Sequence, residues 1–101
     1  MRSYWLNYDL NNPDSYEKMY RWLAGVEAKE CGQSSVFLKF DGSLTELKTA
    51  IKAAVPEIES DKVYVIYKKD SGSEGAFLFG NRNLKNPWDI YATETEEVKD
   101  S

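Results

Sequence analysis

Apolar residues in this chain of 101 residues recur at every second position in some segments and at every third or fourth position in others. This change of period most constrains the fold. In residues 35–40, Val36, Leu38 and Phe40 share one side and the charged Lys39 lies on the other, as in a β-strand. The other predicted strands are also rich in aromatic or β-branched residues: residues 3–10, 62–68 and 76–79.

Two segments between these strands follow the helical period. The first opens with a capping asparagine at Asn12 and a proline at Pro13, and Gly25 offers its end. Its apolar residues stand at positions i, i+3, i+4 and i+7: Tyr16, Met19, Tyr20 and Leu23. The second opens with a capping box from Ser43 to Glu46, followed by a predicted buried stripe of Leu44, Leu47, Ile51 and Val55. These elements predict an α+β fold, a ferredoxin-like βαββαβ sandwich with two helices on one face of a four-stranded antiparallel sheet.

The length and composition predict one domain. The aromatic content of 14% and the hydrophobic content of 42% exclude general disorder, and 101 residues suffice for one core. We expect residues 1–91 to form that domain, with 81–91 as an aromatic segment that packs on the body or is swapped onto a partner subunit. Residues 92–101 are predicted to be an acidic disordered tail. Since no apolar run reaches the roughly 20 residues of a membrane span and no signal peptide is recognisable, we expect a cytoplasmic protein without a membrane partner.

The charge and the reactive residues limit the kinds of function and site that the chain can have. The formal net charge is −4, but the tail at 92–101 contains four acids and one base and so carries −3 of it, which leaves −1 for residues 1–91. A near-neutral body argues only weakly against nucleic-acid binding. The chain contains no histidine, which excludes histidine-dependent catalysis and the usual zinc sites, and its single cysteine cannot form an internal disulfide.

Asp9 is the leading candidate functional residue, because it ends the first predicted strand beside a loop. Its carboxylate can hold a metal, or it can accept backbone N–H bonds in the turn at 11–14 and help to cap the helix. Strand alternation places Asn7 on the same side, where it can assist phosphate binding. The nearest bases after the loop are Lys18 and Arg21.

A second candidate set lies in the C-terminal segment. Arg82, Lys85 and Trp88 together can bind a nucleic-acid strand by charge and stacking. The alternative is that Trp88 anchors this segment to the body of the domain.

Three short segments carry a family resemblance: residues 8–10, 33–37 and 61–67. Their order and spacing within residues 3–80 resemble the Cas-two family of small CRISPR adaptation proteins and the related virulence-associated protein D toxins. The later segment 79–88 also resembles small uncharacterised SinR-like proteins.

The resemblance implies a homodimer of two ferredoxin-like subunits that pair through their sheets, with Asp9 near its symmetry mate. Mg²⁺ or Mn²⁺ bridging the two carboxylates would bind phosphate, and some members of these families are metal-dependent nucleases. The first loop of these families usually supplies arginines, whereas residues 11–15 contain none here.

Two functions therefore follow as hypotheses. The first is a homodimeric protein that engages nucleic acid and cleaves RNA or DNA through the Asp9 of both subunits. The second is a non-catalytic protein-interaction module, such as a defence-system inhibitor or a regulatory subunit. It would use its sheet edge, aromatic segment and acidic tail to bind a protein partner.

Overall fold

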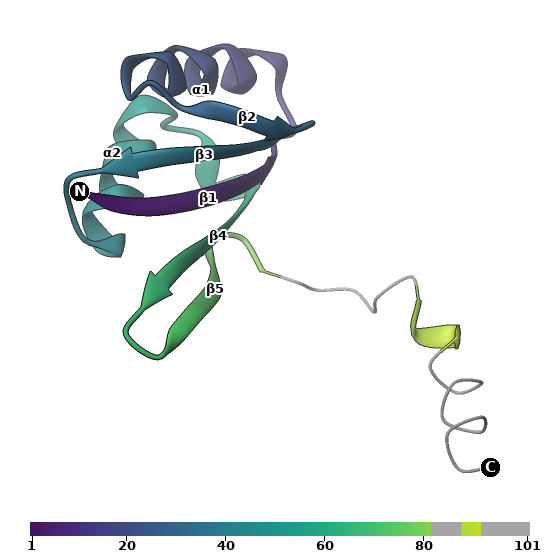
Figure 1. Ribbon diagram of the computed structural model, residues 1–101. Helices are drawn as coiled ribbons and strands as arrows, with labels where there is room; N and C mark the ends of the chain where they lie inside the picture. The colour runs from purple at the N-terminus through teal and green to yellow at the C-terminus, as the bar shows by residue number, and fades with distance from the viewer. Residues whose placement is uncertain (82–87, 92–101) are drawn as a thin grey trace.

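The computed structural model describes residues 1–81 and 88–91, in which a β-sheet is backed by helices (Figure 1). The α+β class predicted from the sequence is confirmed. In chain order the elements are β1 (Arg2–Asp9), α1 (Pro13–Gly25), β2 (Lys29–Gly32), β3 (Ser35–Phe40), α2 (Leu44–Ala54), the 3₁₀ helix η1 (Ile58–Ser60), β4 (Lys62–Lys69) and β5 (Gly72–Phe79).

The sheet has five strands in the order β2-β3-β1-β4-β5, and every neighbouring pair is antiparallel. β1 therefore lies in the middle, paired with β3 on one side and with β4 on the other. The prediction of four strands was wrong, because it missed β2.

β2 lies at one edge of the sheet and pairs only with β3, with a register shift between Glu30 and Gly32. All four of its residues are exposed. A strand that buries no side chain shows no apolar alternation, so the sequence of residues 29–32 resembles a polar loop.

β5 is longer than the predicted strand at 76–79, because the hairpin before it turns within residues 70 and 71. Gly72 already pairs with Lys69. The polar residues that suggested a flexible loop thus continue the ladder to the tip of the hairpin.

Both helices begin where the capping residues predicted. The Asn12 Oδ1 accepts a hydrogen bond from the Asp14 N–H at 2.8 Å. At the start of α2, the Ser43 N–H donates to Glu46 Oε1 at 3.0 Å, and the Glu46 N–H donates to Ser43 Oγ at 3.2 Å. These bonds satisfy backbone donors that the first helical turn leaves free. The bond from the Ser43 N–H is also the main reason that the pKa of Glu46 lies below its usual value.

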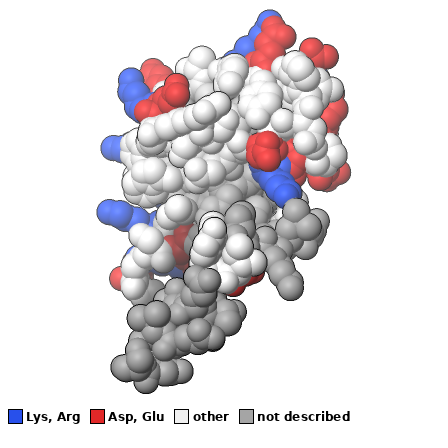
Figure 2. All heavy atoms as spheres, turned by 90° about the vertical axis from the view of Figure 1, so that its right-hand side faces the viewer, with Lys and Arg blue, Asp and Glu red and all other residues white. Residues whose placement is uncertain are grey.

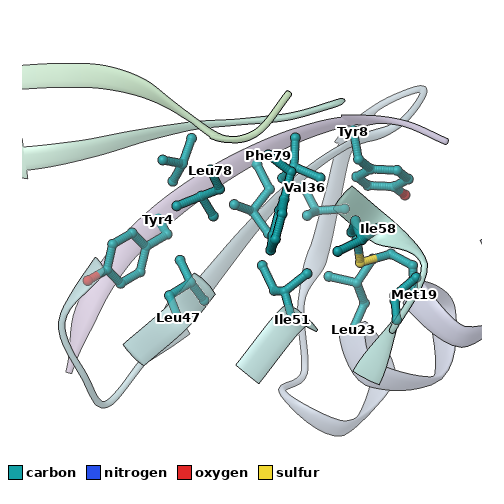
Figure 3. Close-up of a cluster of buried hydrophobic side chains, with 14 of the residues drawn as sticks. Tyr4, Tyr8, Met19, Leu23, Val36, Leu47, Ile51, Ile58, Leu78 and Phe79 are labelled. Carbon is teal, nitrogen blue, oxygen red and sulfur yellow. The ribbon is translucent and has the colours of Figure 1, made fainter. Parts of the chain in front are cut away.

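The hydrophobic core lies between the sheet and the two helices (Figure 3). Leu6 of β1 and Val65 of β4 are paired in register and are fully buried, as is Ile51 of α2. In Figure 3, the sheet contributes Tyr4, Tyr8, Val36, Leu78 and Phe79, which point toward Met19, Leu23, Leu47 and Ile51 of the helices. One face of the sheet is therefore covered by helices.

Hydrogen bonds fix the corner at which β1 ends and β4 begins. Asp61 is 3% exposed, and its Oδ1 accepts a bond from the Asn11 N–H at 2.8 Å. The Asn11 side-chain amide donates to the Ser60 carbonyl at 3.0 Å. Gly80 follows β5 with φ of +72°, and a Cβ there would lie 2.7 Å from the Asp61 carbonyl oxygen. This corner holds the end of β1, and with it Asp9, in place.

Several expectations concern residues beyond the described ranges. The predicted tail at 92–101 lies outside them, and so do residues 82–87 of the aromatic segment. Exchange of that segment between subunits stays a prediction. Among the described residues, no helix combines the length and apolar character that crossing a bilayer requires.

Candidate nucleic-acid interface

An aromatic pair occupies the face of the sheet that the helices leave open. Because side chains alternate along a strand, Trp5 points away from the core that contains Leu6. Trp5 pairs in register with Phe37 of β3, and their ring centroids are 5.1 Å apart at 52°. Both rings are half-buried, so each retains accessible surface near the middle of the sheet.

A second aromatic pair lies beside the first, on β4 and β5. Tyr64 and Phe77 are paired in register, with ring centroids 4.9 Å apart at 74°. A Cβ on Gly75 would lie 2.2 Å from the Tyr64 hydroxyl oxygen, so the glycine leaves room for the tyrosine ring across β5. Phe77 and Ile66, also on this side, are 38% and 36% exposed. We call these five apolar residues the aromatic face: Trp5, Phe37, Tyr64, Ile66 and Phe77.

Lysines surround the aromatic face. By strand alternation and register, Lys39 of β3 and Lys62 and Lys68 of β4 project to this side, as does Lys29, the register partner of Phe37. None of these four lysines forms an ion pair with a described residue. On the strands, the acid on this side is Asp9, opposite Lys62. The face therefore carries a local positive charge although the chain as a whole is acidic.

The structure brings Asn7 and Asp9 together, as strand alternation predicted. Both line an open hollow of about 280 Å³ at the end of the sheet, together with Lys62, Tyr64 and the turn residues Gln33 and Ser34. Asp9 is exposed, and its side chain makes no hydrogen bond within the described ranges. The alternative role in the first turn is therefore wrong for Asp9, because Asn12 caps α1 and Asp61 accepts the Asn11 N–H.

Among the described residues, Asp9 does not belong to a cluster of metal-ligating side chains. Mg²⁺ needs near-octahedral oxygen coordination, and the described residues contain no group of three histidine, cysteine or acidic side chains that could hold a metal. The nearest charged side chain across the ladder is the cation Lys62. Asp9 is the one carboxylate among the described residues that line the hollow.

Lys18 and Arg21 lie on α1, in the helical layer on the other side of the sheet. Lys18 Nζ contacts Glu57 Oε1 at 2.9 Å, and this bond holds the pKa of Glu57 below its usual value. Arg21 contacts Glu17 at 2.6 Å, one helical turn earlier. The structure does not bring these two bases to Asp9.

The C-terminal candidates are only partly described. Arg82 and Lys85 lie outside the described residues. Trp88 begins a helical turn that the Tyr91 N–H closes by donating to the Trp88 carbonyl at 2.9 Å, and its side chain is 63% exposed. Its role in stacking stays a prediction.

The sequence reasoning missed the aromatic face as a binding surface, although a signal was present. Phe37 and Lys39 share the side of β3 that does not carry Val36, and Trp5 and Asn7 repeat this pattern on β1. An aromatic residue followed two positions later by a polar one, on each of two adjacent strands, marks an accessible side with flat apolar rings.

Comparisons of the chain with protein-family models, with curated proteins and with solved structures found no match.

Proposed function

We propose that the protein binds single-stranded nucleic acid on the aromatic face of its sheet. The observation that carries this proposal is the half-buried pair Trp5 and Phe37, which lies on the two adjacent strands β1 and β3, on the face of the sheet opposite the helices. Bases stack on aromatic side chains with about 1–3 kcal/mol per base, whatever their sequence.

Charge and shape favour a single strand. Lys29, Lys39, Lys62 and Lys68 surround the rings and can neutralise backbone phosphates, since no described acid engages them. Bases of a duplex are already stacked inside the helix, whereas those of a single strand can spread over a flat aromatic surface.

The fold supports the same proposal by analogy. The strand order β2-β3-β1-β4, with helices after β1 and β3, agrees with a ferredoxin-like arrangement that β5 extends at one edge. RNA-recognition domains with four-stranded sheets stack bases on aromatic residues of the sheet in this way. The resemblance to the Cas-two and virulence-associated protein D families also favours a nucleic-acid ligand, because some members of these families are nucleases.

The direct test is fluorescence anisotropy with labelled single-stranded RNA and DNA and with the corresponding duplexes, at several salt concentrations. We expect the single strands to bind more tightly. If all four lysines contact phosphates, log K should fall against log salt concentration with a slope of about −3. Equal or tighter binding of the duplex, or no binding of any oligonucleotide, would contradict the proposal.

The metal-dependent nuclease implied by the resemblance is a separate hypothesis, because it requires the Asp9 of two copies. It predicts that Mn²⁺ or Mg²⁺ supports cleavage of labelled RNA or DNA, and that Asp9→Asn abolishes it. The substitution should not unfold the protein, since Asp9 is exposed. Unchanged cleavage by a folded Asp9→Asn variant would remove Asp9 from the mechanism. If neither protein cleaves RNA or DNA, the proposed function is nucleic-acid binding without nuclease activity.

A protein-interaction module is the second candidate function, and the exposed apolar residues near the C-terminus favour it. Trp88, Ile90 and Tyr91 are 63%, 72% and 60% exposed. Large apolar side chains in such a cluster are typical of surfaces that bind another protein. Truncation after Gly80 separates the two functions, because it removes this segment and leaves every residue of the aromatic face. Loss of partner capture with unchanged oligonucleotide binding would assign the segment to a protein partner.

A further inference from the structure

A second hollow lies on the helical side of the sheet, between α1 and the end of β1. It has a volume of about 320 Å³ and is lined by three tyrosines, one acid and two turn residues: Tyr8, Tyr16, Tyr20, Glu30, Gln33 and Ser34. We call it the tyrosine hollow. β1 ends on the right in Figure 1, and Figure 2 views the molecule from that side, where the surface in the upper half is largely uncharged with charged side chains at its margins.

The three rings come from two elements and lie at an angle to one another. Tyr16 and Tyr20 are one turn apart on α1, with centroids 5.9 Å apart at 48°, and Tyr8 of β1 lies 6.1 Å from Tyr16 at 58°. The Tyr16 hydroxyl accepts a hydrogen bond from the Leu10 N–H at 3.2 Å, which fixes the middle ring. Tyr8 is only 7% exposed, so it forms a rigid wall of the hollow.

The hollow has negative electrostatic character. Glu30 is its one formally charged lining residue, and no lysine or arginine lines it. Glu30 forms no ion pair within the part of the chain that the structure describes. Burial, followed by the nearby Tyr20, Glu30 and Tyr16, raises the pKa of Tyr8, so the Tyr8 ring stays neutral at physiological pH. A positively charged group in the hollow would therefore meet tyrosine side chains and a carboxylate that has no ion pair among the described residues.

We propose that the tyrosine hollow binds a quaternary ammonium group, carried either by a choline-type small molecule or by a trimethylated lysine side chain. Ring faces attract cations, and quaternary ammonium groups are recognised in proteins by such clusters of aromatic side chains. A lysine ammonium is compact and strongly hydrated. A trimethylated group is larger and more weakly hydrated, so it contacts several rings at a lower desolvation cost. This site does not depend on the proposed nucleic-acid binding, which uses the opposite face of the sheet.

The first test is calorimetric titration of the full-length protein with choline and with 3,3-dimethylbutan-1-ol, in which carbon replaces the charged nitrogen. We expect choline to bind about tenfold more tightly than the uncharged isostere, because only the cation interacts with the ring quadrupoles and Glu30. Equal binding of the two compounds would show a hydrophobic site and overturn the proposal.

Variants of the exposed lining residues test the assignment without disturbing the core. Tyr20 is 54% exposed, so Tyr20→Leu should fold normally and weaken choline binding about three- to tenfold, whereas Tyr20→Phe should retain it. Glu30→Gln should weaken it by a similar factor. Tyr67→Phe, on β4, is a matched tyrosine control outside the hollow. Choline binding by Tyr20→Leu with the affinity of the wild type would contradict the site.

A third titration separates the two sources of the cation. A short peptide carrying trimethyllysine is compared with the same unmethylated peptide. Tighter binding of the methylated peptide than of choline assigns the hollow to a methylated protein. Binding of choline with no preference between the peptides assigns it to a small molecule. If neither choline nor the methylated peptide binds, the proposal is wrong.

Discussion

Replacing Trp5 and Phe37 together by alanine is expected to weaken the binding of a single-stranded oligonucleotide by about 30-fold or more. Each ring offers one stacking position, and each stack lost to alanine costs about 1–3 kcal/mol. Fluorescence anisotropy with one labelled oligonucleotide measures the ratio of the two dissociation constants. Circular dichroism should show the wild-type fold, since both side chains lie on the side of the sheet opposite the main core.

The matched control is Trp22→Phe on α1, which changes a half-buried tryptophan in the helical layer. We expect its affinity for the oligonucleotide to equal that of the wild type. The mass of each protein in solution should be measured with the same samples. If the double variant binds the oligonucleotide normally but converts a dimer to a monomer, the aromatic face is a subunit interface, as the family resemblance implies, and the binding proposal is wrong.

Much of the fold could be predicted because the elements that bury side chains leave periodic patterns. β3 alternates, β1 and β4 are rich in aromatic and β-branched residues, and α1 and α2 carry capping residues at their first turns. β2 could not be predicted in this way, since an edge strand that pairs with one neighbour and exposes all four side chains leaves no apolar pattern. Its existence depends on backbone pairing with β3.

The candidate site was less predictable, because period 2 shows which residues share a face but not which face the helices cover. Asn7 and Asp9 were correctly placed together. Both Trp5 and Leu6 are apolar, however, so the sequence of β1 does not distinguish its open side from its core side. The sequence does not show long-range partners either. Lys18 and Arg21 are both on α1, but the carboxylate partner of Lys18 is Glu57, which is 39 positions away.

The tyrosine hollow illustrates the same limit. Sequence periodicity placed Tyr16 and Tyr20 on one helical face together with Met19 and Leu23. The structure leaves Tyr20 54% exposed at the hollow, beside the half-buried ring of Tyr16. The combination of three rings with Glu30 arises from tertiary packing, which no local pattern records.

Replacing Leu6 by alanine is expected to lower the free energy of unfolding by about 3 kcal/mol. Leu6 is fully buried and lies between its register partners Val36 and Val65, so the substitution leaves a cavity in the middle of the core. Urea denaturation followed by circular dichroism measures this change. Such a loss is a large part of the stability of a domain of this size, which is typically 5–15 kcal/mol.

Ile66→Ala is the comparison that links stability to function. Ile66 is next to Val65 on β4 but points to the open face, where it is 36% exposed. In an isolated chain, the substitution should therefore lower the free energy of unfolding by only about 1 kcal/mol, since part of this side chain is in contact with water in the folded state. If Ile66→Ala lowers the free energy of unfolding as much as Leu6→Ala does, the open face is buried in solution. A cost that also grows with protein concentration would identify the covering partner as a second copy, because dissociation then contributes to unfolding. A small cost that is independent of concentration leaves the aromatic face free for nucleic acid.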